Sequence, residues 1–467
     1  MKPSEKFDLR VTFPNRVGIV GAGRSGIAAA LYFKSKGTGV FVSDLLAPEF
    51  LKATLTRNGL GEVPYEAGKH TAALLQNDLI VLSPGVRSDL PILVQAREKG
   101  IPVWSELELG FRASDAAFLA ITGSTGKSTT VSLLGEALLA GGRATTIAGN
   151  IGIPLVSVAA GLPRDAVVAA EVSSFQLETI DRFRPLAAAV LNLLKNHLDR
   201  YRSENEYYDA KKRIAENFTK DNFLVLNIHD VKLTAWADTM NKRTNVIFYG
   251  HMPGAGDSFW YDEGMGKIRY RFGGVQGTIL DIKDMKLGGR HNFENAAAAA
   301  ALAKVAGIDD GAIGRGLAGF RGLEHRLEFA GERSGVRYYN DSKSTTAESV
   351  LCAVAAFKGG VHLIAGGRDK GCDFSLLKPA LRRHVVDVSL IGEAAGRMEA
   401  EWQGIVPIYR CVTLEEAVLA AAHRSLPGDA VVFSPGCSSF DMFANYEDRG
   451  NRFKAIVAAL TGERIVR

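Results

Sequence analysis

Residues 117–129 read AFLAITGSTGKST, an apolar run that leads into a turn with two glycines and one lysine. The apolar run predicts a buried strand, and the residues from Lys127 onward predict a helix. A strand, a glycine-rich turn and a helix in this order direct backbone N–H groups at phosphate oxygens. Lys127 would add a positive charge, and Ser128 could bind Mg²⁺. The stretch predicts a phosphate-binding loop, although Ile121 stands where the general pattern has a further glycine; a turn built for packing alone is the alternative.

The chain on both sides of this loop alternates short apolar runs with helical patterns, which predicts α/β domains with parallel sheets. Its 467 residues exceed what one hydrophobic core usually serves. We expect a Rossmann-like domain at 1–107, a central P-loop mononucleotide-binding domain at 108–321 and a Rossmann-like domain at 322–467. The predicted strands are 16–20, 39–43, 79–82, 117–121, 166–170, 187–191, 223–227, 336–340, 361–365, 385–391 and 430–433. The predicted helices include 25–35, the segment from Lys127 and the alanine-rich run 296–301.

The composition is that of an ordinary globular protein, with 46% apolar and 23% charged residues and a net charge of +5. The sequence has no block of lysines and arginines, so we expect neither a nucleic-acid partner nor a membrane surface. Its four cysteines form no CxxC pair, which fits a reducing compartment. Residues 1–16 are polar, and the run 296–303 is too short to span a bilayer. We therefore expect a cytoplasmic protein without membrane insertion.

A second glycine-rich turn follows the first predicted strand. Gly21-x-Gly23-x-x-Gly26 leads into a helix, and Asp44 ends the next strand, as in dinucleotide-binding domains. The pattern favours a nucleotide ligand of open identity, with NAD or a well-packed turn as alternatives. Because the chain also carries the phosphate-binding loop, a plain dehydrogenase is disfavoured.

Polar residues also follow several of the other predicted strands. Glu171, His197 and the pair Lys211 and Lys212 belong to the central part, where each has an ordinary structural explanation as well. The C-terminal part has four such segments, at 324–326, 340–346, 366–371 and 434–441. Loops of this composition can be simple turns. Since parallel strands end at one edge of a sheet, we expect these loops to gather into a site for carboxylates or phosphates.

Eight motifs in this order resemble the Mur ligase family, and the similarity runs over nearly the whole chain. They are GSTGKST at 123–129, EVSSFQLE at 171–178, NHLDRY at 196–201, GRHNFEN at 289–295, EHRLE at 324–328, NDSKSTT at 340–346, AGGRDKG at 365–371 and SPGCSSFDMFANYEDRGNRF at 434–453. The phosphate loop of the family also lacks the earlier glycine, so Ile121 supports the resemblance. The combination of NDSK with GGxDKG is similar to the family member that adds D-glutamate.

The resemblance implies an ATP-dependent acid–amino-acid ligase of peptidoglycan precursor synthesis. Such an enzyme adds D-glutamate to UDP-N-acetylmuramoyl-L-alanine through an acyl-phosphate and releases ADP and phosphate. A sister ligase with another amino acid is the nearest alternative, and an NAD-dependent oxidoreductase is an alternative of a different class. We expect a monomer, whose partners are these two substrates.

The resemblance also implies roles for individual residues. The implied catalytic residues are Lys127, Glu171, His197, Lys211 and Lys343. The implied ATP-binding residues are Gly123, Ser124, Thr125, Gly126, Lys127, Ser128, Thr129, Asn292, Asn295, Arg326 and Asp341. The implied UDP-substrate residues are Arg24, Ser25, Asp44, Ser83, Asn150, Gln176 and His197. The implied D-glutamate residues are Thr345, Lys370, Ser439, Phe440 and Tyr446.

Two Mg²⁺ sites are implied as well, one at Ser128 and Glu171 and one near His197. An ammonium group beside Mg²⁺ would repel it, and in this family the matching lysine is converted by CO₂ into a carbamate, an acidic oxygen ligand. We place the carbamate at Lys211, with Lys212 as the alternative. Asn196 departs from the acidic residue that usually precedes the histidine, which affects the second metal site.

Overall fold

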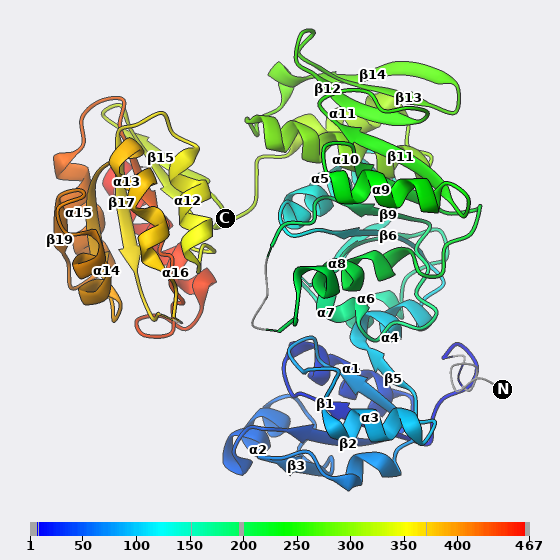
Figure 1. Ribbon diagram of the computed structural model, residues 1–467. Coiled ribbons are helices and arrows are strands. Elements are labelled where there is room, and N and C mark those ends of the chain that lie inside the picture. Colours follow the sequence, from blue (N-terminus) through cyan, green and yellow to red (C-terminus); the bar gives the residue numbers. More distant parts are fainter. Residues whose placement is uncertain (1–6, 8, 151, 196–199, 370, 463–467) are drawn as a thin grey trace. The chain divides into compact units, whose positions relative to one another are not determined.

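The computed structural model describes residues 7, 9–150, 152–195, 200–369 and 371–462. Contacts divide the chain into two compact units, Met1–Arg321 and Gly322–Arg467 (Figure 1). The first unit contains two separate sheets and the second contains one. The expected α/β class with three sheet-based domains is confirmed, whereas the boundary between residues 107 and 108 stays a prediction because both sheets fall in the first unit.

The N-terminal sheet has five parallel strands in the order β3-β2-β1-β4-β5. The strands are β1 Arg16–Val20, β2 Gly39–Asp44, β3 Tyr65–Ala67, β4 Leu79–Leu82 and β5 Val103–Ser105. The helices are α1 Arg24–Ser35, α2 Pro48–Arg57, η2 Ala72–Gln76, α3 Pro91–Glu98 and α4 Glu106–Arg112. The strand order reverses between β1 and β4, and ligands of such sheets bind in the crevice at this reversal.

The central sheet has nine strands in the order β14-β13-β12-β11-β10-β9-β6-β8-β7. The strands are β6 Ala117–Thr122, β7 Thr145–Gly149, β8 Val167–Glu171, β9 Ala187–Val190, β10 Phe223–Asn227, β11 Asn245–Gly250, β12 Ser258–Asp262, β13 Lys267–Phe272 and β14 Val275–Asp281. The helices are α5 Lys127–Ala140, α6 Leu155–Ala159, α7 Ser174–Leu177, α8 Glu204–Lys212, η3 Arg213–Ala215, α9 Val231–Met240, η4 Ile282–Asp284, α10 Arg290–Val305 and α11 Asp310–Gly319. Strands β6 to β12 pair in parallel, whereas β13 and β14 extend the sheet as antiparallel strands.

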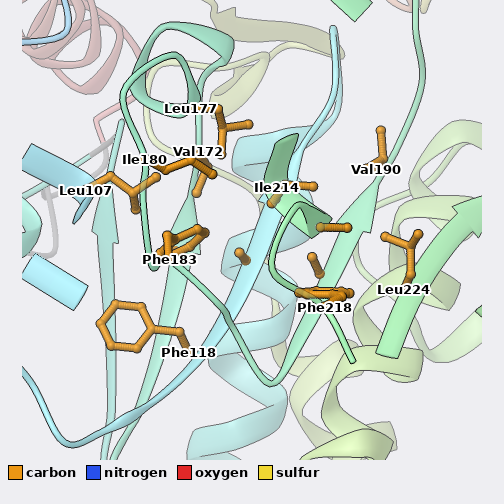
Figure 2. Close-up of a cluster of buried hydrophobic side chains, with 14 of the residues drawn as sticks. Leu107, Phe118, Val172, Leu177, Ile180, Phe183, Val190, Ile214, Phe218 and Leu224 are labelled. Atoms are coloured by element: carbon orange, nitrogen blue, oxygen red, sulfur yellow. The ribbon is translucent and has the colours of Figure 1, made fainter. Parts of the chain in front are cut away.

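Apolar side chains fix the central sheet to the segments around it (Figure 2). Phe118 of β6 meets Phe183 in a T-shaped contact at 6.3 Å, and Phe111 contacts both rings. On α10 the residues 296–303 are completely buried. Seven of these eight residues are alanines, whose small side chains allow close packing. Helices α11 and α5 also pack closely, since a methyl group added to Gly316 of α11 would lie 2.5 Å from the Ala137 Cα of α5. This packing holds the phosphate loop between a rigid strand and a rigid helix.

The second unit contains a six-stranded sheet in the order β15-β16-β20-β17-β18-β19, with β15 antiparallel to β16 and the other pairs parallel. The strands are β15 Glu328–Arg333, β16 Val336–Asn340, β17 Val361–Gly366, β18 Val385–Ile391, β19 Ile408–Arg410 and β20 Ala430–Phe433. The helices are α12 Ala347–Ala355, η5 Phe374–Leu377, α13 Lys378–His384, α14 Ala395–Trp402, α15 Leu414–Arg424 and α16 Tyr446–Thr461. Within the described ranges, every helix is too short or too polar to cross a bilayer.

The glycine turn after β1 gives a test of this packing. A methyl group added to Gly26 would lie 1.8 Å from the Gly21 carbonyl oxygen, whereas one added to Gly23 would meet nothing within 4 Å. We expect Gly26→Ala to lower the free energy of unfolding by at least about 2 kcal/mol, because the backbone must shift to admit the methyl group. Gly23→Ala should change it by less than about 0.5 kcal/mol. Urea unfolding followed by circular dichroism compares the variants, and equal midpoints would show that the turn is not tightly packed.

Candidate active site

The phosphate loop connects β6 to α5 and is stabilised by its own lysine. Gly123 and Gly126 have φ values of +151° and +82°, which residues other than glycine rarely adopt. The Lys127 Nζ donates hydrogen bonds to the carbonyl oxygens of Gly123 at 2.9 Å and Ser124 at 3.1 Å. These contacts curl the loop around the ammonium group at the start of α5. The loop therefore has the conformation and the charge that a phosphate site needs.

Asn192, which belongs to none of the sequence motifs, shapes the same loop. Its Oδ1 accepts hydrogen bonds from the backbone N–H groups of Ser124 and Thr125, both at 2.9 Å. Asn192 follows β9, which pairs with β6, so its side chain lies beside the loop. The amide oxygen thus accepts hydrogen bonds from backbone N–H groups of the kind that bind phosphate oxygens in such loops. A polar residue directly after the strand predicted at 187–191 is the sequence signal that could have identified it.

Glu171 lies beside the loop because of the strand register. It is the last residue of β8 and pairs with Ile121 of β6 on one side and Gly149 of β7 on the other. The carboxylate is 1% exposed, and its Oε1 accepts a hydrogen bond from Asn150 Nδ2 at 2.9 Å. Within the described structure its Oε2 has no hydrogen-bond partner. A buried carboxylate oxygen without a partner is costly, and a cation would satisfy it.

Lys211 approaches the loop from α8. Its side chain is 2% exposed, and its Nζ donates to the Gly123 carbonyl oxygen at 2.9 Å and lies 4.6 Å from the centre of the Tyr207 ring. Burial and the nearby Lys127 ammonium lower the pKa of Lys211 to about 6, although Glu171 acts in the opposite direction. Lys212 differs, because it is partly exposed and its Nζ lies 3.4 Å from Asp209. Lys211 is therefore the lysine that reaches the loop.

The implied UDP-substrate residues of the N-terminal domain meet at the sheet reversal. Ser83 follows β4 and donates a hydrogen bond to the Gly21 carbonyl oxygen at 2.8 Å. Asp44 at the end of β2 accepts from the backbone N–H of Ala22 at 2.5 Å. Arg24 and Ser25 begin α1 directly after this turn. The glycine turn is thus fixed from two neighbouring strands, with the start of α1 presented at the crevice.

Two further implied substrate residues lie in the central domain. Gln176 of α7 is 1% exposed and forms a capping box with Ser173. In this box, Gln176 Oε1 accepts a hydrogen bond from the Ser173 backbone N–H at 3.0 Å. Within the described residues its Nε2 has no hydrogen-bond partner. Asn150 follows β7 and is held by Glu171. Gln176 therefore offers a buried amide donor for a ligand.

The implied adenine residues lie on α10. Asn295 is adjacent to the loop, since a methyl group added to Gly126 would lie 2.7 Å from its Oδ1. Asn292 instead donates through Nδ2 to the Gly288 carbonyl oxygen at 2.8 Å and so stabilises the helix start. Of the two asparagines, Asn295 is thus the one with a contact at the phosphate loop.

The implied residues of the second unit surround the loop after β16. Asp341 is 4% exposed, and its carboxylate accepts hydrogen bonds from Ser434 at 2.7 Å, from Ser344 and from the Leu327 backbone N–H at 3.0 Å. Burial raises the pKa of Asp341 to about 6, against the effect of these hydrogen bonds. Lys343 Nζ lies 5.8 Å from the centre of the Tyr446 ring. Asp341, Lys343 and Tyr446 therefore belong to one local cluster.

The other implied D-glutamate residues are distributed around this unit. Ser439 is 2% exposed, Phe440 is 59% exposed and Thr345 is half-buried. Arg326 is exposed in the segment before β15. Lys370 and His197 lie outside the described residues, as does Asn196. The structure thus brings Lys127, Glu171 and Lys211 together in the first unit and Asp341, Lys343 and Tyr446 together in the second.

Comparison with known protein families covers most of the chain in three consecutive parts. Residues 15–105 match the Mur ligase MurD-like N-terminal domain, 121–303 the Mur ligase middle domain and 325–437 the Mur ligase glutamate ligase domain. Two similar proteins, from Geotalea daltonii and Acidobacterium capsulatum, are named UDP-N-acetylmuramoylalanine--D-glutamate ligase. They are 41% and 40% identical over 96% of this chain, which covers 98% and 97% of their lengths.

The chain belongs to the Mur ligase family.

Solved structures support the same fold. UDP-N-acetylmuramate-alanine ligase MurC from Thermotoga maritima is 19% identical with a TM-score of 0.57, and the match covers 95% of this chain and 99% of that one. MurF ligase from the same organism, solved in complex with ADP, is 17% identical with a TM-score of 0.56 over 90% and 96% of the two chains. At this identity the likeness concerns the fold alone. Both have the Mur ligase architecture found here.

The buried amine of Lys211 predicts a pH dependence of stability. Its pKa is lowered from 10.5 to about 6 in the folded protein, so between these values the unfolded chain binds a proton that the folded one does not. Stability of the wild type should therefore rise with pH above 6, by up to about 1.4 kcal/mol per unit. Lys211→Met, which removes this group, should be more stable than the wild type near pH 6, with an advantage that shrinks toward pH 9. Urea unfolding in CO₂-free buffer measures the difference.

Lys212→Met is the matched control for this experiment. Its side chain is partly exposed beside Asp209, and the substitution leaves the buried Lys211 amine in place, so this variant should keep the rise of stability with pH that Lys211 causes. A pH-independent difference between wild type and Lys211→Met would contradict the lowered pKa.

Proposed function

We propose that this protein is an ATP-dependent ligase that joins D-glutamate to the alanyl carboxylate of UDP-N-acetylmuramoyl-L-alanine and releases ADP and phosphate. The observation that carries the proposal is the full-length likeness, at 41% identity, to a protein named UDP-N-acetylmuramoylalanine--D-glutamate ligase. The first unit also contains both the glycine turn at Gly21 and the phosphate loop around Lys127, which supports the proposal. The same pair of sites argues against an NAD-dependent oxidoreductase, which would leave the phosphate loop without a task.

The chemistry explains why the site is rich in cations. A carboxylate is a poor electrophile, and its approach to ATP brings two anions together. Transfer of the γ-phosphoryl group to the alanyl carboxylate gives an acyl-phosphate and ADP. The amine of D-glutamate then attacks the carbonyl carbon, phosphate leaves, and the nitrogen loses a proton to give the amide. Lys127 and the N–H groups at the start of α5 stabilise the negative charge of the phosphates, and the same role is proposed for Arg326 and Lys343.

Residues that fit a Mg²⁺ ion are present beside the loop. Mg²⁺ prefers oxygen ligands. The buried Glu171 Oε2 without a partner and the Ser128 hydroxyl, which is 5% exposed, are suitable oxygens for the first ion. A second ion would be held near His197 and a carbamate at Lys211. Bound Mg²⁺ would offset the negative charge of the phosphates.

The state of Lys211 favours the carbamate. A neutral amine attacks CO₂, and the product loses a proton to give an N-carboxylate. Because the pKa of Lys211 is lowered to about 6, its amine is largely neutral at pH 7. Lys212 stays the alternative, although its partly exposed ammonium group beside Asp209 is less suited to the reaction. Carbamylation would convert this buried, largely neutral amine into an anionic oxygen ligand of the kind that Mg²⁺ prefers.

The remaining substrate-binding residues are proposed from the resemblance to the family. The proposed UDP-substrate residues are Arg24, Ser25, Asp44, Ser83, Asn150, Gln176 and His197. The proposed nucleotide residues beyond the loop are Asn292, Asn295, Arg326 and Asp341. The proposed D-glutamate residues are Thr345, Lys370, Ser439, Phe440 and Tyr446. Working as a cytoplasmic monomer, the enzyme would supply peptidoglycan precursors and so serve cell-wall synthesis, cell shape and cell division.

One assay tests the amino-acid substrate. With ATP, Mg²⁺ and UDP-N-acetylmuramoyl-L-alanine, we expect phosphate release to depend on D-glutamate, because the amine completes the second step. L-Alanine, L-lysine and meso-diaminopimelate should each support less than about 1% of that rate, as expected when a polar site rejects an ill-fitting ligand. Turnover with L-lysine or meso-diaminopimelate in place of D-glutamate would reassign the protein to a sister activity.

A second experiment locates the carbamate. Loss of a group that only orients a metal ligand lowers activity by about 10- to 100-fold, so Lys211→Ala, which would remove a ligand itself, should lower kcat by at least that much. Lys212→Ala should keep most of the activity. With ¹³C-labelled bicarbonate, a carbamate NMR signal should appear in the wild type and in Lys212→Ala but not in Lys211→Ala. The opposite pattern would move the modification to Lys212.

A further inference from the structure

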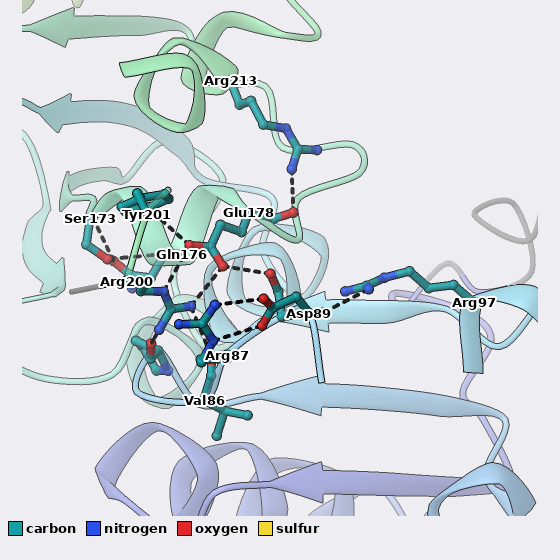
Figure 3. A network of polar contacts seen from close by, with 12 residues as sticks. Val86, Arg87, Asp89, Arg97, Ser173, Gln176, Glu178, Arg200, Tyr201 and Arg213 are labelled. Atoms are coloured by element: carbon teal, nitrogen blue, oxygen red, sulfur yellow. Dashed lines mark hydrogen bonds and ion pairs between the residues drawn. The ribbon is translucent and has the colours of Figure 1, made fainter. Parts of the chain in front are cut away.

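Glu178 collects hydrogen bonds from both domains of the first unit (Figure 3). Its Oε2 accepts from Ser88 Oγ at 2.7 Å and from Arg200 Nη2 at 2.8 Å. Its Oε1 accepts from the Tyr201 hydroxyl at 2.7 Å and from Arg200 Nε at 3.1 Å. The side chains of Glu178 and Arg200 are only 14% and 12% exposed. The carboxylate is thus fully engaged, and Ser88 comes from the N-terminal domain.

Arg200 also contacts the loop that follows β4. Its Nη2 donates to the Val86 carbonyl oxygen at 3.1 Å, and its Nη1 lies 3.4 Å from the Pro84 carbonyl oxygen. The guanidinium lies 4.2 Å from the centre of the Phe175 ring of α7. One planar group therefore joins a carboxylate, two carbonyl oxygens and an aromatic face. Lysine cannot make these contacts together, because its charge is a single point at the end of the chain.

The two segments joined in this way carry opposite halves of the proposed substrate site. Residues 84–88 continue from Ser83, whose hydroxyl fixes the Gly21 carbonyl oxygen of the nucleotide turn. Helix α7 carries Gln176, whose buried Nε2 has no hydrogen-bond partner in the described structure. Glu178 follows this helix directly, and Arg213 donates to its backbone carbonyl oxygen. The network thus connects the uridine side of the site with the side of the sugar and peptide.

We propose that Arg200 and Glu178 are positioning residues that fix the segment 84–88 of the N-terminal domain against helix α7, so that the UDP-linked substrate meets a preformed site. The proposal rests on the proposed function for the identity of that substrate and for the residues that bind it. A site held in its binding geometry gains affinity because less conformational freedom is lost on binding. Removal of the network should therefore affect binding of this one substrate rather than every step.

Arg200→Lys is the decisive variant, because it keeps the charge and loses the fork of donors. We expect the KM for UDP-N-acetylmuramoyl-L-alanine to rise about tenfold, with the KM values for ATP and D-glutamate and kcat changed less than about twofold. Arg202→Lys is the matched control, since Arg202 lies two positions away with an exposed side chain, and its constants should equal those of the wild type. Equal changes in all three KM values, or a loss of kcat alone, would overturn the proposal.

A double-mutant cycle tests whether the two residues act together. Glu178→Gln should also raise the KM for the UDP-linked substrate, and the double variant should raise it by clearly less than the product of the two single effects. Effects that multiply fully would mean that the residues act independently, contrary to the proposal.

Hydrogen exchange separates this proposal from the proposed function. In the protein without substrates, amide exchange in residues 85–88 should be faster in Arg200→Lys than in the wild type and Arg202→Lys, because the contacts of Arg200 with this segment are lost. Unchanged exchange would refute the positioning role whatever the enzyme assays show. If exchange is faster in Arg200→Lys than in the wild type, but the wild type shows no D-glutamate-dependent phosphate release, the network is supported while the proposed function is refuted.

Discussion

The candidate active site depends on the parallel pairing of β6 with its neighbours in the central sheet. Parallel strands end at one edge, so the pairing of Ile121 with Glu171 and of Thr122 with Val190 brings three strand ends together. The phosphate loop, the Glu171 carboxylate and Asn192 meet there for that reason. Because side chains alternate along a strand, a shift of one residue in β8 would turn Glu171 to the opposite face. The apolar core in Figure 2 thus positions the polar groups of the site indirectly, because it fixes the register of β6, β8 and β9.

The same edge concentrates polar groups that the fold leaves incompletely satisfied. Lys211 is buried with a lowered pKa, Glu171 has an oxygen without a partner, and Gln176 has an unpartnered Nε2 in the described structure. Each arrangement costs folding free energy in isolation. A ligand that supplies hydrogen-bond or ionic partners to these groups would offset that free-energy cost. Part of its binding affinity would therefore come from groups that the fold already holds in place. By contrast, Glu178 is fully paired, as suits a group that positions other segments.

Much of the site could be predicted from the sequence because its signals are local. A strand, a glycine turn and a helix are contiguous, so the loop around Lys127 and the turn at Gly21 were found directly. Asn192 and Arg200 were missed, because their roles depend on contacts 67 to 116 residues away along the chain and on a strand order that no local pattern contains. The sequence also did not predict β12 or the antiparallel strands β13 and β14, since their mixed polar and apolar residues resemble surface segments. Lys211 and Lys212 cannot be told apart by the sequence pattern, and they differ in burial, since Lys211 is buried and Lys212 is partly exposed.

The start of the second unit determines how Arg326 can act. His325 and Leu327 have φ values of +61° and +44°, an unfavourable backbone conformation that needs support from tertiary contacts. That support is present: His325 is 4% exposed and contacts Asn340, its carbonyl oxygen accepts from the Lys343 backbone N–H at 3.0 Å, and the Leu327 N–H donates to Asp341. Arg326 is therefore held to the body of the second unit together with Asp341 and Lys343. Whatever ligand these three groups engage, the contacts among their backbones hold them as one set within the second unit, so they would meet that ligand together.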